Sequence, residues 1–256
     1  MNNSAVTATN ISLGYDSTIV FTDSSFTIPQ GSLTAVIGPN GSGKSTLLNA
    51  IANLAKPLKG SIQIHSAKEK APKLSYVLQT HHLNQALPVT VEEVVTMGRY
   101  AGLRPHQRLQ DIDRQAVYNA MARTSITEIK HRHIHNLSVG QRQRVFVAQG
   151  LAQEHDLLLL DEPLAGIDMP TAKDIDTVIH NERDHGCTVI STTHDLSEAR
   201  VSDHVLLLAG RVVASGTPQD VLTYENLAAA YGSSLVHGTN GQLFVDDAPH
   251  HHTHDH

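Results

Sequence analysis

Residues 38–46 read Gly-Pro-Asn-Gly-Ser-Gly-Lys-Ser-Thr and match the phosphate-loop pattern G-x-x-x-x-G-K-[S/T] at every specified position. Glycines let such a loop turn tightly, so that its backbone amides point at phosphate oxygens. Lys44 would place a positive charge against the same phosphates, and the Ser45 hydroxyl would coordinate Mg²⁺. The predicted nucleotide-binding residues of the loop are Gly38, Pro39, Asn40, Gly41, Ser42, Gly43, Lys44, Ser45 and Thr46.

The segments on either side of this loop agree with the motif. Leu33 to Ile37 is a short apolar run rich in β-branched residues, which is typical of a buried parallel strand. Ser45 to Leu54 reads as a helix whose N-terminal dipole would face the phosphates. The chain is therefore expected to bind a nucleoside triphosphate.

Strand and helix patterns divide the rest of the chain. Alternating or continuous apolar runs predict strands, and helical periodicity replaces them between about residues 83 and 151. Thr90, followed three residues later by Glu93, forms a capping-box pattern at the start of the first helix of this block. The predicted strands lie at 11–15, 25–28, 33–37, 61–64, 74–78, 157–160, 188–192 and 205–208.

These patterns predict an α/β domain over residues 1–235 with an N-terminal antiparallel β-subdomain and an inserted α-helical subdomain over about 83–151. Residues 236–256 would form a C-terminal extension that ends in a histidine-rich tail. Five of the last seven residues are histidines, a composition that predicts disorder and the capacity to bind a transition metal. The candidate ligands are His250, His251, His252, His254 and His256, although a disordered end or a purification remnant would look similar.

Bulk composition excludes several classes of protein. The formal net charge of −6, with no lysine- or arginine-rich run, argues against nucleic acid as a partner. The N-terminus lacks the basic and apolar regions of a signal peptide, and no stretch reaches the roughly 18 apolar residues of a membrane span. The single cysteine, Cys187, lies in an apolar run and is expected to be buried in a strand. The chain is expected to be cytoplasmic.

A phosphate loop alone leaves kinases, GTPases and motor ATPases open. Leu157 to Leu160 is an apolar strand that ends in Asp161 and Glu162. At the end of a buried strand, Asp161 would hold Mg²⁺ and Glu162 would act as the general base toward the attacking water.

The segment Leu137-Ser138-Val139-Gly140-Gln141 precedes that strand. Here the chain resembles the ATP-binding-cassette (ABC) ATPases, whose signature at this point is Leu-Ser-Gly-Gly-Gln, and the resemblance extends over roughly residues 6–232. It implies a P-loop NTPase core and a head-to-tail homodimer that encloses two ATP molecules, with Ser138, Gly140 and Gln141 facing the nucleotide of the other protomer. Val139 departs from the signature, and a β-branched residue resists a positive φ there.

The resemblance also assigns roles outside these motifs. It implies that Tyr15 stacks on adenine, that Asp168 lies in a loop crossing the dimer interface, and that His194 contacts the γ-phosphate. It implies that Gln79 senses Mg²⁺ and the attacking water. The catalytic set is thus Glu162, His194, Gln79 and Lys44, and the Mg²⁺ set is Ser45, Gln79 and Asp161.

One cassette without a membrane span fits an ATPase subunit, two copies of which dock at the inner face of the membrane beneath a permease served by an extracytoplasmic binding protein. Residues 90–100, Thr-Val-Glu-Glu-Val-Val-Thr-Met-Gly-Arg-Tyr, resemble a segment of metal-ion and metal-chelate importers and are expected to contribute to docking. The expected function is ATP-driven uptake of a transition-metal ion, zinc first and manganese second. The alternatives are a siderophore, haem or cobalamin importer and, less expected, a soluble non-transport ABC ATPase.

Overall fold

The computed structural model describes residues 4–66 except 16 and 17, 71–78, 88–104 and 106–232, together with the backbone of 235–237 and 243–245; of Tyr15 it describes the backbone alone. A three-stranded antiparallel sheet has the order β2-β1-β4. A six-stranded sheet has the order β5-β6-β7-β3-β8-β9, parallel except for β9. A third, two-stranded sheet pairs β10 with β11.

The strands of the three sheets are β1 (Ser4–Tyr15), β2 (Thr18–Pro29), β3 (Leu33–Ile37), β4 (Lys59–Ile64), β5 (Leu74–Val77), β6 (Leu157–Leu160), β7 (Thr188–Thr192), β8 (His204–Leu208), β9 (Val212–Gly216), β10 (Leu235–His237) and β11 (Leu243–Val245). The helices are α1 (Lys44–Ile51), α2 (Val91–Tyr100), α3 (Asp111–Arg123), α4 (Val139–Ala152), α5 (Met169–Asp184), α6 (Leu196–Val201), α7 (Pro218–Val221) and α8 (Tyr224–Tyr231), with 3-10 turns at Thr127–Ile129 and Ile134–Asn136.

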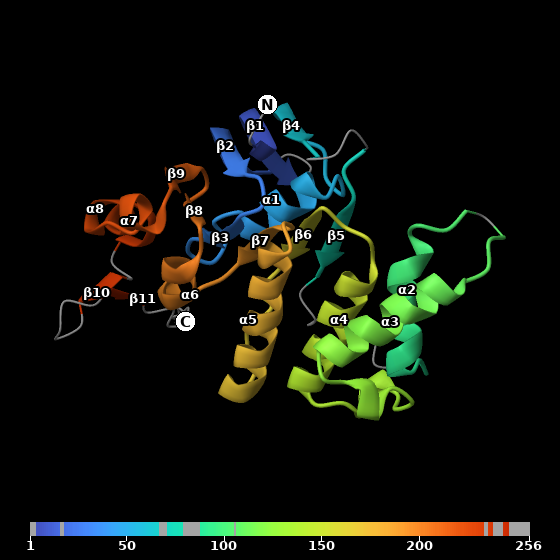
Figure 1. Cartoon of the computed structure of the whole chain (residues 1–256). Helices are drawn as coiled ribbons and strands as arrows, with labels where there is room; N and C mark the ends of the chain where they lie inside the picture. The colour runs from blue at the N-terminus through green and yellow to red at the C-terminus, as the bar shows by residue number, and fades with distance from the viewer. Residues whose placement is uncertain are drawn as a thin grey trace, which may run out of the picture.

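The elements stack in layers. The antiparallel sheet and α1 lie on one side of the six-stranded sheet, and α4, α5 and α6 lie on the other (Figure 1). The four leucines of β6 are all buried because both faces of the sheet are covered. Leu157 and Leu159 pack in the cluster that contains α1 and β1, and Leu158 and Leu160 pack in the cluster that contains α5. Side chains alternate across a strand, so a sheet covered on both faces requires a continuous apolar run.

Between β5 and β6 the described chain is helical, as the periodicity predicts, and α2, α3 and α4 form a separate group with its own core (Figure 1). The predicted capping box is present, because Glu93 N–H donates to Thr90 Oγ1 at 3.3 Å and Thr90 N–H donates to Glu93 Oε2 at 2.7 Å. At Gly98 an added Cβ would lie 2.2 Å from the carbonyl oxygen of Gln149 in α4. Only glycine permits this approach of the two helices.

The predicted fold class is confirmed, with differences at the ends of elements. Helix α1 ends at Ile51 rather than Leu54, and Asn53 takes a left-handed φ of 58° just beyond it. Strands β1 and β2 are longer than predicted, at 12 residues each, because they pair along most of their length. The β10–β11 pair was not predicted. Within the described ranges, no helix is both long enough and apolar enough to cross a membrane.

Candidate nucleotide site

The phosphate loop follows the carboxyl end of β3, in the middle of the six-stranded sheet. Its first glycine, Gly38, has a φ of 151°, and a Cβ there would lie 2.2 Å from the carbonyl oxygen of Leu208 in β8. Gly43 has a φ of 98° and precedes the first residue of α1. Side chains other than hydrogen would be strained at both positions, so the motif's glycines are explained by backbone geometry.

Polar groups converge on this loop in a way that fits a triphosphate. Lys44 Nζ is buried and donates to the carbonyl oxygens of Gly38 at 2.8 Å and Pro39 at 3.3 Å. Ser42 Oγ is buried and has no hydrogen-bond partner among the described residues. Gly43, the N-cap of α1, has no side chain that could accept from the first amides of the helix. Phosphate oxygens would accept from the Ser42 hydroxyl, the Lys44 ammonium and the amides of the loop.

The carboxyl ends of β6 and β7 bring the predicted acids and His194 together. Thr192 Oγ1, at the end of β7, donates to Asp161 Oδ1 at 2.7 Å and accepts from the Glu162 backbone N–H at 2.8 Å. His194 Nε2 and Glu162 Oε1 are 2.5 Å apart. Glu162 itself has a φ of 49°, and the bond to Thr192 helps to hold it in that unusual conformation.

Sequence reasoning missed Thr192. Thr192 lies in β7, a wholly buried strand. It could have been found as the last residue of the strand that pairs with β6, which Asp161 and Glu162 follow. Sequence reasoning also gave Glu162 and His194 separate roles, whereas the structure makes them direct hydrogen-bond partners.

The signature segment forms the start of α4. Ser138 is the N-cap: its Oγ accepts from Gln141 N–H at 3.2 Å, and Gln141 Oε1 accepts from Ser138 N–H at 3.1 Å. The positive φ that valine would resist does not occur, because Val139 is the first helical residue and is absent from the positive-φ positions of the described chain. Its side chain is 45% exposed. At Gly140 a Cβ would lie 3.1 Å from Thr171, so α4 and α5 begin in close contact.

Asp168 is the N-cap of α5, and its carboxylate accepts from the Thr171 N–H at 3.0 Å and the Thr171 hydroxyl at 2.9 Å. These hydrogen bonds lower the pKa of Asp168, so the carboxyl group remains ionised. From α4, Arg144 reaches Asp174 of α5 at 2.7 Å. The signature helix and the predicted interface loop are thus joined within one protomer.

Several predicted residues lie outside the described part of the chain: Gln79, the side chain of Tyr15, and the tail histidines His250, His251, His252, His254 and His256. The alternating histidines His131, His133 and His135, which also suggested metal binding, form no cluster of three ligands in the described chain. In the described residues the only cluster of three or more potential ligands is His155, Glu182 and Cys187.

Comparison with known proteins assigns the chain to a family. The sequence pattern described as ABC transporter matches residues 21–165, which is more than half of the chain. The chain belongs to the ABC transporter family. As the ATPase of that family, it binds and hydrolyses ATP.

Three named relatives illustrate the range within this ABC family. The chelated iron transport system membrane protein YfeB of Yersinia pestis is 37% identical over 233 residues, which is 88% of this chain and 78% of YfeB. The manganese transport system ATP-binding protein MntA of Synechocystis is 36% identical over 223 residues, 85% of each chain. The ferric enterobactin transport ATP-binding protein FepC of Escherichia coli is 37% identical over 238 residues, 87% of this chain and 85% of FepC.

Solved structures agree with the fold of the ABC ATPase. An inward-facing transporter assigned to the metal-chelate type superposes with a TM-score of 0.81 at 25% identity, covering 95% of this chain and 97% of that one. The cassette MJ0796, a dimer in a post-hydrolysis state with ADP and phosphate, gives a TM-score of 0.73 at 25% identity and covers 83% and 98%.

Proposed function

We propose that this ABC ATPase is the energy-supplying subunit of an importer for a transition-metal ion, working as a homodimer at the inner face of the membrane beneath a separate permease. The observation that carries the catalytic part is the hydrogen-bonded set at the carboxyl ends of β6 and β7, where Thr192 joins Asp161 and Glu162, and Glu162 contacts His194. An extracytoplasmic binding protein would deliver the cargo.

Each group at this edge has a distinct role in the proposal. The loop residues 38–46 hold the phosphates, with Lys44 as the fixed positive charge. Glu162 takes the proton of the attacking water, and His194 orients Glu162 and contacts the γ-phosphate. Gln79 completes the water site, and Tyr15 stacks on the adenine.

Mg²⁺ would be held by the Ser45 hydroxyl and the Asp161 carboxylate, with Gln79 nearby, and would neutralise charge on the phosphates when bound. These oxygen ligands fit Mg²⁺, which prefers oxygen. Among the described residues, one side-chain hydroxyl, that of Thr192, donates to the buried Asp161 carboxylate. Ser138, Gly140 and Gln141 would face the ATP of the partner protomer, with Asp168 in the loop between the two.

The cargo assignment depends on the relatives. MntA and the MntB proteins are named for manganese, and YfeB and FepC for chelated iron and ferric enterobactin. These names support a metal or metal-chelate cargo. They favour manganese more than the zinc expected from the sequence, and they keep a ferric-siderophore cargo as the second candidate.

Whole-cell elemental content tests the cargo. Cells that carry Glu162→Gln, grown in metal-poor medium, should contain several-fold less manganese or zinc than cells with the native chain, because uptake requires hydrolysis. A fall in iron alone would assign the chain to the chelate importers. A rise in any metal would reverse the direction of transport, and unchanged contents for all metals would refute the importer proposal.

The docking segment needs a narrower definition than the sequence suggested. In residues 90–100, the capping box and three buried valines (Val91, Val94 and Val95) build the helix and its core. Arg99 Nη2 pairs with Asp113 Oδ1 of α3 at 2.8 Å. The pattern therefore largely encodes packing of α2.

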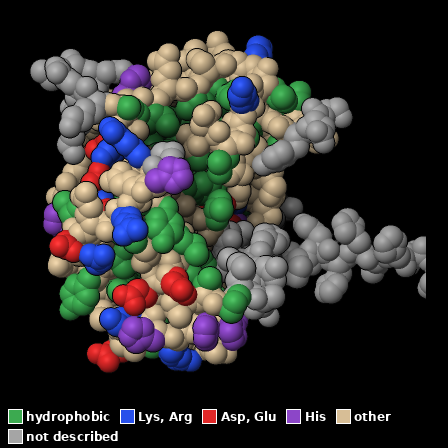
Figure 2. All heavy atoms as spheres, turned by 90° about the vertical axis from the view of Figure 1, so that its right-hand side faces the viewer, with side chains coloured by type: hydrophobic (Ala, Val, Ile, Leu, Met, Phe, Trp, Pro, Cys, Tyr) green, Lys and Arg blue, Asp and Glu red, His purple; other side chains and the backbone are tan. Residues whose placement is uncertain are grey.

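Two large hydrophobic residues of α2 are available to a partner, because Met97 is 41% and Tyr100 is 55% exposed. On this side of the molecule, hydrophobic side chains lie among acidic, basic and histidine side chains (Figure 2). We place the permease contact of the proposal on Met97 and Tyr100, together with the segment that follows β5.

Replacing Met97 and Tyr100 together by serine should weaken binding of the chain to membranes by about tenfold or more, since buried interface anchors contribute more than 1 kcal/mol each. The measurement is co-sedimentation with membranes from cells that lack the native chain. The control pair, Leu58→Ser with Tyr224→Ser, removes two exposed apolar side chains from other elements. Equal binding by both double variants would contradict the docking surface.

A further inference from the structure

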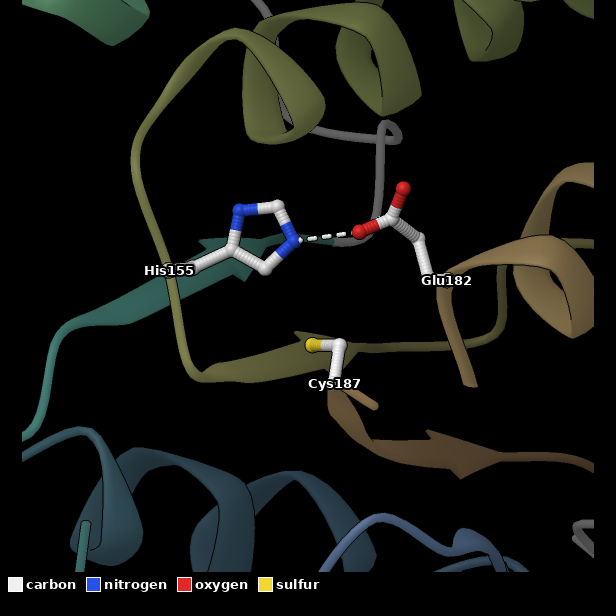
Figure 3. Close-up of side chains that lie close together, drawn as sticks. All are labelled: His155, Glu182 and Cys187. Carbon is white, nitrogen blue, oxygen red and sulfur yellow. Dashed lines mark hydrogen bonds and ion pairs between the residues drawn. The ribbon is translucent and has the colours of Figure 1, made fainter. Parts of the chain in front are cut away.

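A buried cluster of three metal-binding side chains lies at the edge of the sheet opposite the nucleotide site. His155 stands in the turn before β6, Glu182 near the end of α5, and Cys187 directly before β7. Their ligand atoms lie within 4.8 Å of one another, and Figure 3 shows the three side chains pointing toward a common space. The phosphate loop, Asp161 and Glu162 follow the carboxyl ends of the strands, so this cluster plays no part in the ATP site.

The imidazole of His155 is oriented as in metal sites. Its Nδ1 is 2.7 Å from the carbonyl oxygen of Gln153, which can only accept, so Nδ1 carries a hydrogen. The other nitrogen, Nε2, faces Glu182 Oε2 at 2.8 Å. Because a carboxylate only accepts, Nε2 donates to Glu182 here, and a metal ion would take the place of that proton. A backbone carbonyl on the far nitrogen is the usual support for a ligating histidine.

The carboxylate of Glu182 has an outside partner as well. Arg123 at the end of α3 contacts Glu182 Oε1 at 2.5 Å, which leaves Oε2 directed at His155. Cys187 Sγ completes the cluster and lies within hydrogen-bond distance of the carbonyl oxygens of Thr188 at 3.3 Å and Asp156 at 3.6 Å. Each of the nitrogen and oxygen ligands is therefore fixed by a group that does not itself bind the ion.

The cluster is buried, because the side chains of His155 and Glu182 are only 7% and 9% exposed. A metal ion bound here would replace the proton held between His155 Nε2 and the Glu182 carboxylate.

We infer that His155, Glu182 and Cys187 form a binding site for a divalent transition-metal ion of the zinc class. The nitrogen, oxygen and sulfur donors match the ligand types of Zn²⁺ and Co²⁺, and three protein ligands leave one position of a tetrahedron for water. Through Arg123, the site joins the helical group to α5 and the sheet.

Titration of the full-length, reduced chain with Co²⁺ tests the site directly. A thiolate bound to cobalt gives a charge-transfer band in the near ultraviolet, and Cys187 is the only cysteine of the chain. The histidine tail cannot produce this band. We expect the band to saturate at one ion per chain and to disappear when Zn²⁺ is added, because zinc binds such donors more tightly.

Cys187→Ser should abolish the band, and His155→Ala or Glu182→Gln should weaken cobalt binding by at least about tenfold. His185→Ala is the matched control, because His185 lies at the end of α5, the helix that contains Glu182. The described hydrogen bond of its side chain is to Asn181 alone. No band at saturating cobalt in the native chain would overturn the inference, whatever the folding of the variants. A band that survives both His155→Ala and Glu182→Gln unchanged would also overturn it.

Discussion

Glu162→Gln is expected to lower the rate of ATP hydrolysis by about 10²- to 10⁴-fold, the usual contribution of a positioned general base. Glutamine has the same shape but cannot take a proton from water at neutral pH. Its backbone N–H would still donate to Thr192, and its amide could still pair with His194, so the site should remain folded. Phosphate release at saturating ATP measures the rate, and binding of a non-hydrolysable ATP analogue measures affinity, which should change little.

The matched control for this variant is Glu225→Gln, an exposed acid in the first turn of α8. It removes the same charge from a helix far along the chain and should hydrolyse ATP at the native rate. Native turnover in Glu162→Gln would exclude Glu162 as the general base. A loss of nucleotide affinity equal to the loss of rate would instead assign it a binding role.

Thr192→Val is expected to reduce turnover by about 10- to 100-fold although Thr192 itself contacts no substrate in the proposal. Valine keeps the shape of threonine in a fully buried strand but removes the hydroxyl that bridges Asp161 and the Glu162 backbone. The Glu162 N–H would lose its partner, which also lowers the free energy of unfolding by about 1–3 kcal/mol. Steady-state kinetics and urea unfolding measure the two effects.

A positioning role and a simple loss of stability give different outcomes. Thr192→Ser restores the hydroxyl and should recover most of the turnover, even though it leaves a small cavity that costs stability. If Thr192→Val lowers the free energy of unfolding while its kcat stays native, the bridge is structural only. A fall in kcat with an unchanged KM would support the positioning of Glu162.

The segment 90–100 combines a prediction that the structure confirms with one that stays a prediction. The Thr90–Glu93 capping box was expected and is present, whereas docking of the segment to a permease is not tested by the fold. In the structure, Thr90 and Glu93 cap the helix, and Gly98 permits contact with α4. The capping pair is local and can be predicted from its spacing, whereas the reason for Gly98 is the backbone of Gln149, far along the chain.

At Val139 the structure decides a question of backbone conformation that the sequence left open. The glycine of the family signature raised the question of a positive φ, but the backbone at this point is the first turn of a helix. Helical φ is open to valine at little cost. Glycine in a family motif therefore does not prove a positive φ at the matching position of a given chain.

The sequence alone determined the phosphate loop, the buried strands, the helical block and the family, because each depends on a short continuous segment with its own spacing. The tertiary structure decided everything that depends on strand pairing. Thr192 and Glu162 are 30 residues apart and meet because β6 and β7 are neighbours. His155 and Cys187 are adjacent for the same reason at the opposite ends of those strands. Short motifs can be recognised from residues that are close in the sequence, whereas contacts between distant residues depend on the order of strands in the sheet.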